Sequence, residues 1–215
     1  MFKGIDISEW QGSFNWPEID FIIIRAGDGT YWDAMLEENI SKAVRSGIPY
    51  GLYWFIRDHS ASGASMTASK IIQYVDQLKT GPTMGIWADI EDNDEWGDPS
   101  TAITPAISFC KTIEASGYYT GIYCNWYFHD KLYPACNAYD CWIADWDSIL
   151  DLAPGTLQQY STSHGTLDLD ISFVDDLSIY DLKKVPTKPE PEPPGNNKNK
   201  IIEAIRKLLN ELEAI

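Results

Sequence analysis

The sequence predicts an α/β protein built as an irregular β/α barrel, a TIM-like barrel that lacks some helices. Three observations predict it: eight short strand-like runs, helical patterns between the early runs, and strands that are apolar on both faces. Buried strands that alternate with helices form parallel sheets through right-handed crossovers. Eight such strands can close into a barrel, and an open doubly wound sheet is the alternative.

The strand candidates are runs of apolar, β-branched and aromatic residues, the types that are enriched in strands. Three consecutive Ile residues mark the second run, and aromatic residues fill the third. We expect strands at residues 2–8, 21–26, 51–57, 84–90, 118–125, 141–146, 155–160 and 167–173.

Helical patterns separate the earlier strand candidates. Residues 33–46 place Leu36, Ile40 and Val44 at helical spacing and end at Gly47, a residue that favours a helix C-terminus. Residues 65–78 and 104–115 show the same kind of pattern. Fewer helices separate the later strand candidates, and this loss makes the predicted barrel irregular.

The composition changes after Asp181, and the change predicts three segments. Residues 1–183 form the main domain, residues 184–200 contain five prolines among charged and Asn residues, and residues 201–215 are amphipathic. Proline-rich segments of this kind are stiff, extended linkers. A coiled-coil spacing of 4, 3, 4 and 3 residues separates the apolar positions Ile201, Ile205, Leu208, Leu212 and Ile215. We therefore expect residues 201–215 to form a homo-oligomerisation helix, with packing on the main domain as the alternative.

The sequence holds 32 acidic and 16 basic residues, a formal net charge of −16. This balance repels phosphate groups and argues against a nucleic-acid binder. No run of 18 apolar residues is present, so we expect no membrane span, and the first residues show no signal peptide. We therefore expect synthesis in a cytoplasm. The four cysteines lack C-x-x-C spacing, which argues against a zinc site and favours free thiols, with a Cys136–Cys141 bridge as the alternative.

The strongest chemical signal is a pair of acids at the end of the run at residues 84–90. Asp89 and Glu91 are two residues apart, so in a strand their side chains point the same way while Ile90 packs behind them. Buried carboxyl groups are costly to hold. Mutual repulsion also raises the pKa of one of them, as general acid catalysis near neutral pH requires.

Two other interpretations exist for the acids of this segment. A solvated acidic turn is the interpretation we adopt for the acids that follow, Asp92, Asp94, Glu95 and Asp98. A calcium loop at residues 92–97 matches poorly, because Trp96 occupies a ligand position and no Glu closes the loop.

Two further acidic positions lie in strands that a closed barrel brings together. Asp6 lies at the end of the first strand, and Asp168 and Asp170 share one face of the last strand. The first and last strands of a closed barrel are neighbours, so Asp6 and one of the last two acids can flank the acid pair described above. Arg25, on a buried strand, is a cation that these acids could use or that could be structural.

Aromatic residues gather at other strand ends, and most of them are expected to be core residues. Sugar faces stack on aromatic rings, so a carbohydrate site would use some of them. The residues that we expect to bind substrate are Tyr53, Tyr123, Trp142 and Tyr160.

Three motifs, in this order, resemble the glycoside hydrolase family 25 lysozymes, which include many phage endolysins. The motifs are Gly4-Ile-Asp6-Ile-Ser8-Glu-Trp10-Gln11-Gly12, Asp89-Ile-Glu91 and Leu167-Asp168-Leu-Asp170-Ile. The resemblance covers about residues 1–182, and the family's Trp-Gln-Tyr-Ser segment is Gln158-Gln159-Tyr160-Ser161 here. It implies an irregular β/α barrel and hydrolysis of the β-1,4 bond between N-acetylmuramic acid and N-acetylglucosamine in bacterial peptidoglycan.

The resemblance also implies a role for each acid. Glu91 matches the general acid, and Asp89 matches its partner, which acts as a nucleophile or through the N-acetyl group of the substrate. Asp6 and Asp168 match two supporting acids, whereas Asp170 matches a position that is often Asn in the family. We expect no metal and no organic cofactor. The expected partner is bacterial peptidoglycan, and we expect the protein to act on the cell wall after its release from the host cytoplasm.

Two other functions are alternatives to a lysozyme. A chitinase-like hydrolase uses the same Asp-x-Glu arrangement with assistance from the N-acetyl group, but the motif from Asp6 to Gly12 favours the lysozyme. A non-catalytic module that binds cell-wall glycan is the third function, and the presence of Glu91 argues against it.

Overall fold

A computed structural model of the protein describes residues 1–91, 93–146, 155–161 and 167–181. These residues belong to one compact unit, Met1–Lys183. The predicted linker and the predicted oligomerisation helix belong to a second unit, Lys184–Ile215, and lie outside the described residues.

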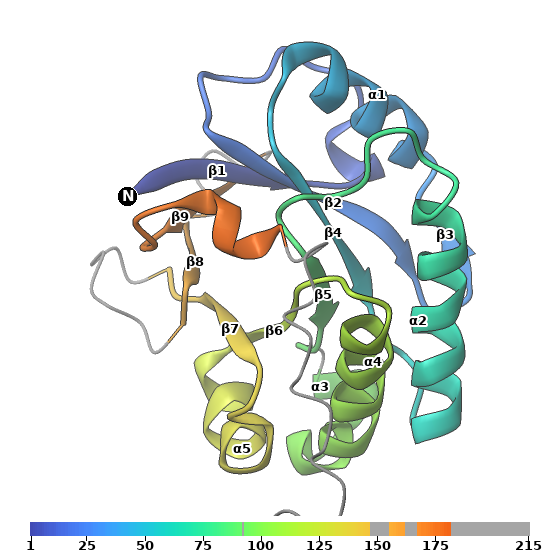
Figure 1. Cartoon of the computed structure of the whole chain (residues 1–215). Helices are drawn as coiled ribbons and strands as arrows, with labels where there is room; N and C mark the ends of the chain where they lie inside the picture. Colours follow the sequence, from blue (N-terminus) through green and yellow to red (C-terminus); the bar gives the residue numbers. More distant parts are fainter. Residues whose placement is uncertain (92, 147–154, 162–166, 182–215) are drawn as a thin grey trace, which may run out of the picture. The chain divides into compact units, whose positions relative to one another are not determined.

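A closed barrel of eight strands forms the centre of the described unit (Figure 1). The strands follow the order β1-β9-β8-β7-β6-β5-β4-β2, and β1 pairs with β2 to close the ring. The short strand β3 pairs only with the end of β2. The strands are β1 (Phe2–Ile7), β2 (Phe21–Asp28), β3 (Tyr31–Trp32), β4 (Tyr50–Phe55), β5 (Ile86–Asp89), β6 (Thr120–Asn125), β7 (Asp140–Ala144), β8 (Leu157–Ser161) and β9 (Asp168–Ser172). The predicted irregular barrel is confirmed.

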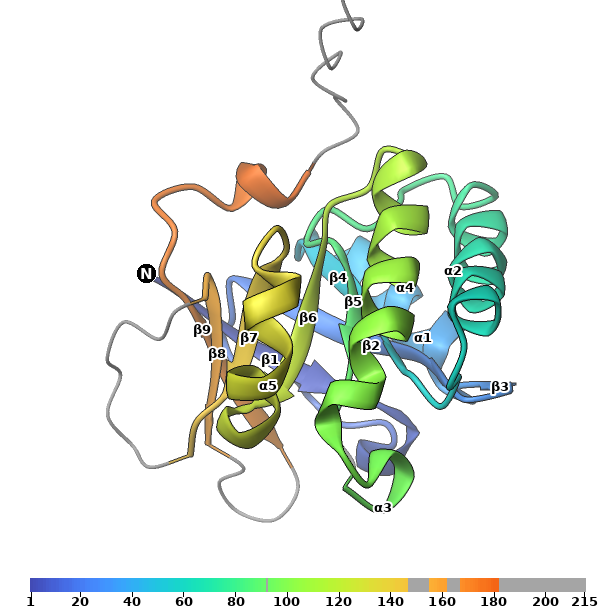
Figure 2. The same cartoon turned by 90° about the horizontal axis from the view of Figure 1, so that it is seen from below.

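Helices pack on the outside of the ring, and α2 and α4 lie side by side (Figure 2). Local sequence sets their ends: Ser60 caps α2 by accepting a hydrogen bond from the Gly63 amide, and Gly47 ends α1 in the left-handed conformation. The helices are α1 (Leu36–Ser46), α2 (Ala61–Val75), α3 (Asn93–Trp96), α4 (Ile103–Ala115) and α5 (Trp126–Cys136).

Two features differ from the sequence-based expectation. The last strand, β9, runs antiparallel to both β8 and β1, whereas we expected a parallel sheet throughout. Only six residues separate Ser161 from Asp168, too few for the helical crossover that a parallel connection needs. The helix α5 was not predicted, because Pro134 lies inside it and its mixed polar and aromatic sequence has a weak apolar periodicity.

The core has two layers, one on each side of the barrel wall. The outer layer packs the helices on the strands, and the inner layer fills the barrel with large side chains that include Phe21, Trp87 and Trp142. Gly121 makes room for one of them, because a Cβ atom there would lie 2.4 Å from the Trp87 ring. The four cysteines are buried free thiols, as expected. In the described part of the chain, no helix has the length and apolar character needed to cross a membrane.

Candidate functional site

Four acids converge at the end of the barrel where the parallel strands finish. Asp89 is the last residue of β5, and Glu91 follows two positions later. Asp6 lies near the end of β1, directly opposite Asp168 at the start of the antiparallel β9. This register brings a carboxyl group from the last strand to the same end as the others, the end at which barrel enzymes place their active sites.

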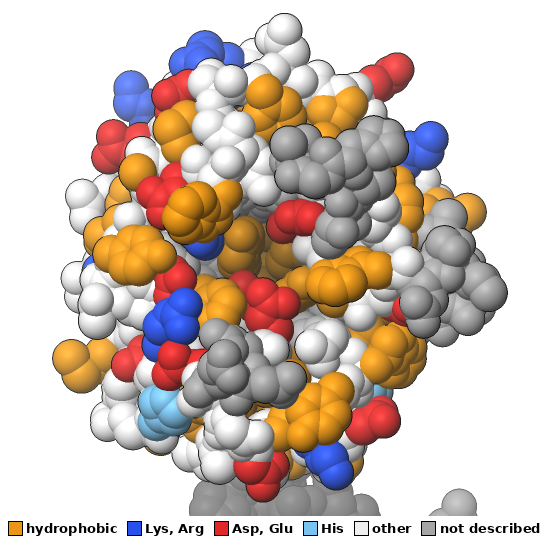
Figure 3. Space-filling view, turned by 180° about the vertical axis from the view of Figure 1, so that it is seen from behind, with side chains coloured by type: hydrophobic (Ala, Val, Ile, Leu, Met, Phe, Trp, Pro, Cys, Tyr) orange, Lys and Arg blue, Asp and Glu red, His pale blue; other side chains and the backbone are white. Residues whose placement is uncertain are grey.

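A pocket of about 190 Å³ lies among these acids. Its wall combines carboxyl groups with aromatic rings, and Figure 3 shows a hollowed face in which acidic side chains lie between hydrophobic ones. The lining residues are Asp6, Tyr53, Asp89, Glu91, Tyr123, Trp142, Trp146, Gln159 and Asp168.

The pocket brings together the four predicted acids and three of the four predicted aromatic residues. Tyr160 is the exception: it lies at an irregularity of β8, between Gln159 and Ser161, and does not line the pocket. Gln159 and Trp146 were not among the predicted site residues. The alternation of side chains along a strand could have identified Trp146, since it lies two and four residues after Ala144 and Trp142.

Hydrogen bonds fix the orientation of the Gln159 amide and, through it, the Asp6 carboxyl group. The Gln159 Oε1 atom accepts hydrogen bonds from the Tyr123 hydroxyl (3.0 Å) and from Trp146 Nε1 (2.9 Å). Its Nε2 atom therefore faces the other way and donates to Asp6 Oδ2 at 2.8 Å. Gln159 thus supports an acid of the pocket.

Burial and mutual repulsion favour the protonated form of these acids. The pKa of Asp89 is raised well above its usual value by burial, then by the charges of Glu91 and Asp6. The pKa of Asp6 is raised to about 7 by burial and by Asp168, against the lowering effect of its hydrogen bonds. Because each charge disfavours the next, the cluster retains protons near neutral pH. A site of this kind can donate a proton.

The first motif continues from β1 into a short capped helix. Ser8 caps the short helix Glu9–Gln11, and the Gln11 side chain accepts a hydrogen bond from the Ser8 amide, so the two ends fix each other. Glu9 also accepts a hydrogen bond from Arg25 Nη2 at 2.8 Å. Arg25 also binds Asp33 at 2.7 Å, so its charge is paired with two acids, Glu9 and Asp33. Of the two roles considered for Arg25, these contacts support the structural one.

The acidic residues that follow β5 make structural contacts. Glu95 binds Arg57 at 2.9 Å and His59 at 2.7 Å, and Asp98 caps the short helix Pro99–Ala102. The Trp96 side chain is buried. Within the described ranges, no group of three acidic, His or Cys side chains is arranged to hold a metal ion.

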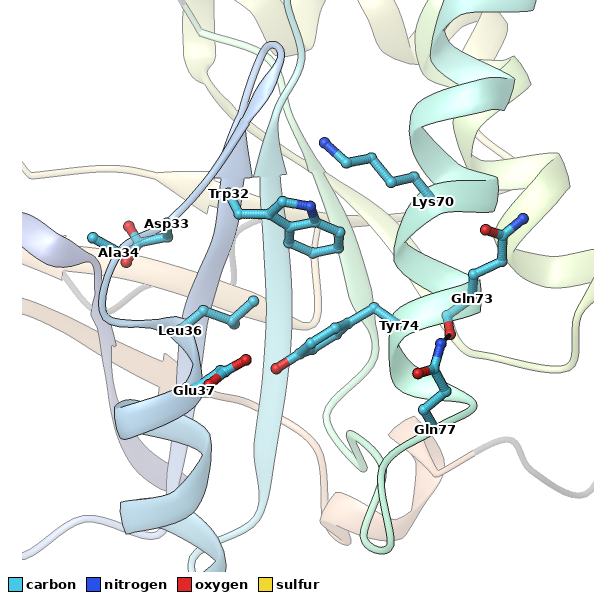
Figure 4. A pocket seen from close by; sticks show the side chains of 9 residues that line it. All are labelled: Trp32, Asp33, Ala34, Leu36, Glu37, Lys70, Gln73, Tyr74 and Gln77. Atoms are coloured by element: carbon cyan, nitrogen blue, oxygen red, sulfur yellow. Dashed lines mark hydrogen bonds between the residues drawn. The ribbon is translucent and has the colours of Figure 1, made fainter.

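A second and larger hollow, of about 620 Å³, lies outside the barrel (Figure 4). Trp32 and Tyr74 lie against each other in its wall, with ring centroids 5.0 Å apart, and Lys70 Nζ lies 4.8 Å from the Trp32 ring. Of its two acids, Asp33 is already bound to Arg25, and Glu37 is exposed. It therefore offers no buried carboxyl pair, and the acid pocket remains the candidate active site despite its smaller size.

The raised pKa of Asp6 predicts an unusual pH dependence of stability. The folded protein holds a proton on Asp6 up to about pH 7, whereas the unfolded chain releases it near pH 4. The free energy of unfolding should therefore fall as the pH rises from 4 to 8, by about 4 kcal/mol from Asp6 alone. Urea unfolding at a series of pH values measures this slope.

Asp6→Asn is the matched variant for this measurement, since the amide cannot ionise. Its slope over the same pH interval should be clearly shallower than that of the wild type. Equal slopes in the two proteins would show that Asp6 does not hold a proton in the folded state.

Comparisons with known proteins identify a matching family and similar folds. The family model described as glycosyl hydrolases family 25 matches residues 5–165. Lysozyme M1 of Streptomyces globisporus is 39% identical over 69 residues, which cover 29% of this chain and 24% of that protein.

Two solved structures share the fold. The modular autolysin LytC of Streptococcus pneumoniae has a TM-score of 0.69 at 23% identity, covering 79% of this chain and 46% of that chain. The catalytic domain of endolysin ply40 from bacteriophage P40 of Listeria monocytogenes has a TM-score of 0.69 at 19% identity, covering 85% and 98%. The chain thus spans less than half the length of lysozyme M1 and of LytC, and nearly all of the ply40 catalytic domain.

Proposed function

The chain belongs to the glycosyl hydrolases of family 25, and we propose that it is a muramidase that acts on bacterial peptidoglycan. The bond hydrolysed is the β-1,4 bond between N-acetylmuramic acid and N-acetylglucosamine. The observation that carries this proposal is the pocket itself, in which Asp89 and Glu91 lie with two supporting acids between aromatic rings.

Glu91 is the proposed proton donor. It lies beyond the end of β5, half-buried on the pocket wall, where a glycosidic oxygen can reach it. Departure of a sugar as an alcohol requires a proton on the bridging oxygen, and a carboxylic acid in the pocket supplies it in the transition state.

Asp89 is the proposed stabiliser of the positive charge that develops on the sugar ring. It is deeper than Glu91, and its Oδ1 atom is buried without a hydrogen-bond partner among the described residues. A buried acceptor of this kind is free to meet a substrate group, either the anomeric carbon or the N–H of the acetamido group. Both interactions use the ionised form of Asp89, which the positive charge of the transition state favours, although burial favours the protonated form in the free protein.

The aromatic residues of the pocket support a sugar as the ligand. Trp142 is packed against Tyr53 and Tyr123 with ring centroids 6.0 and 4.5 Å away, so the rings hold one another in place. Trp146 is more than half exposed at the rim, and its Nε1 atom is held by Gln159. A rigid aromatic edge at the mouth of an acidic pocket provides an apolar surface for a sugar face.

Digestion of purified peptidoglycan and of chitin, side by side, tests the proposed substrate. The proposal predicts release of soluble fragments from peptidoglycan and little or none from chitin at the same enzyme concentration. Equal or faster release from chitin would support the chitinase-like alternative, and release from neither would support a glycan-binding module.

We also propose that residues 201–215 join several chains. The support is the coiled-coil spacing of the apolar positions after a stiff linker. A helix of 15 residues is marginal alone in water, so its apolar face needs a partner. Several catalytic units on one stalk would gain avidity for a polymeric wall.

Light scattering on the full chain and on a chain that ends at Lys184 measures this directly. The full chain should form an oligomer at micromolar concentration, and the shortened chain should be a monomer. Two monomers would exclude self-association and favour packing of the helix on its own catalytic unit.

A further inference from the structure

Asp170 is a fully buried carboxyl group with no part in the proposed reaction. It lies on β9, opposite Gly4 and one level deeper in the barrel than Asp168, and its exposed fraction is 0%. Its Oδ1 atom accepts a hydrogen bond from Trp142 Nε1 at 2.8 Å. Its Oδ2 atom receives no hydrogen bond from any described residue. An ionised carboxylate with one empty oxygen is costly at such a depth.

The side chain that Asp170 meets is another acid, Asp6. Asp6 and Asp170 are diagonal neighbours on one face of the β1–β9 pair, and each carboxyl group shifts the pKa of the other through a side-chain hydrogen bond. Two carboxyl groups can share a hydrogen bond only when one of them carries the proton. Asp6 Oδ2 already accepts from Gln159, whose orientation the Tyr123 and Trp146 donors fix. On each acid, a neighbouring donor therefore fixes one oxygen as an acceptor: Trp142 on Asp170 and Gln159 on Asp6. The two remaining oxygens, one from each acid, share a single proton.

Burial and charge place this proton on Asp170. The titratable groups that face it are Asp6 from β1, Asp168 from β9, Tyr123 from β6 and Tyr160 from β8. Burial raises the pKa of Asp170 well above its usual value, and the charges of Asp6 and Asp168 act in the same direction. Asp6 borders the pocket and has a pKa of about 7, so it releases its own proton first.

We propose that Asp170 is a neutral acid whose Oδ2–H group donates a hydrogen bond to Asp6 and holds that carboxyl group in place beside the reacting acids. Asp170 is thus a positioning residue, which acts on the pocket through Asp6. The position of the proton is inferred from the contacts above. Its effect on catalysis rests on the proposed muramidase function.

The Asp170→Asn variant distinguishes the two possible charge states. An Asn side chain can accept from Trp142 through its oxygen and donate to Asp6 through its NH₂ group, so it reproduces the neutral acid. Carboxyl ¹³C NMR of labelled aspartates follows the titration of Asp6. We expect its midpoint to move by less than about half a pH unit in this variant. A fall of about one unit or more would mean that the substitution removed a negative charge, and this would overturn the proposal.

Asp170→Leu is the matched variant, because it keeps the number and branching of the side-chain heavy atoms and carries no donor. It should raise the Asp6 midpoint, because the ionised form of Asp6 loses a hydrogen bond. An unchanged midpoint in a folded Asp170→Leu protein would also overturn the proposal. Where this variant does not fold, the size of the shift in Asp170→Asn still decides.

Kinetics on peptidoglycan test the positioning role. Asp170→Asn should keep kcat within about threefold of the wild type, whereas Asp170→Leu should lower kcat by about tenfold with little change in KM. Asp168→Asn should cost more than Asp170→Asn, since Asp168 borders the pocket. A loss in Asp170→Asn as large as that in Asp168→Asn would exclude the positioning role. Inactivity of the wild type itself would instead contradict the proposed function and leave the NMR result standing.

Discussion

Replacement of Glu91 by Gln is expected to lower kcat on peptidoglycan by about 10²–10⁴-fold, the usual contribution of general acid catalysis. The two side chains have nearly the same shape, so the variant removes the transferable proton and little else. Because Glu91 is only half-buried, the melting temperature should stay close to that of the wild type. Release of reducing ends from purified walls measures the activity, and circular dichroism measures the fold.

Glu95→Gln is the matched control for this prediction. It makes the same chemical change four residues later, on a side chain that binds Arg57 and His59 and does not border the pocket. Its activity should remain near that of the wild type. Wild-type activity in folded Glu91→Gln protein would end the assignment of Glu91 as the proton donor.

Replacement of Asp89 by Asn is the second large expected effect, a fall in kcat on the order of 10²–10³-fold. The amide cannot supply the negative charge that faces the developing positive charge of the sugar. Stability should move in the opposite direction, because Asp89 is buried and its pKa is raised well above the usual value. At pH 8 the variant should therefore unfold at the same urea concentration as the wild type or at a higher one.

Asp98→Asn is a suitable control for Asp89→Asn. It removes an acid from the same segment of the chain, and Asn remains a good N-cap for the helix Pro99–Ala102. This control should keep the wild-type activity. An Asp89→Asn protein that is folded and retains more than about a tenth of the wild-type activity would rule out the electrostatic role.

Sequence patterns predicted most strands of the barrel because these strands carry a clear signal. The triple Ile of β2 and the runs around β4 and β5 are apolar on both faces, as strands covered on both sides must be. The direction of β9 escaped prediction, since apolar alternation is the same in either direction. The length of the segment between Ser161 and Asp168 was the available signal for an antiparallel connection.

The four pocket acids could be predicted because alternation within a strand and closure of the barrel are properties of the sequence pattern. Asp6 and Asp168 do lie opposite each other, as the neighbouring first and last strands required. The role of Gln159 could not be predicted, because it depends on two donors, Tyr123 and Trp146, that come from other strands. The same is true of Asp170, whose contact with Trp142 joins residues 28 positions apart.

Mass spectrometry of fragments from purified peptidoglycan tests the central claim most directly. Reduction of the fragments with borohydride marks the new reducing end, and the fragment mass identifies the sugar that carries it. The proposed muramidase predicts reduced N-acetylmuramic acid at every new end in the wild-type digest, and none in the Glu91→Gln digest. Reduced N-acetylglucosamine at the new ends, or fragments shortened only in their peptides, would contradict it.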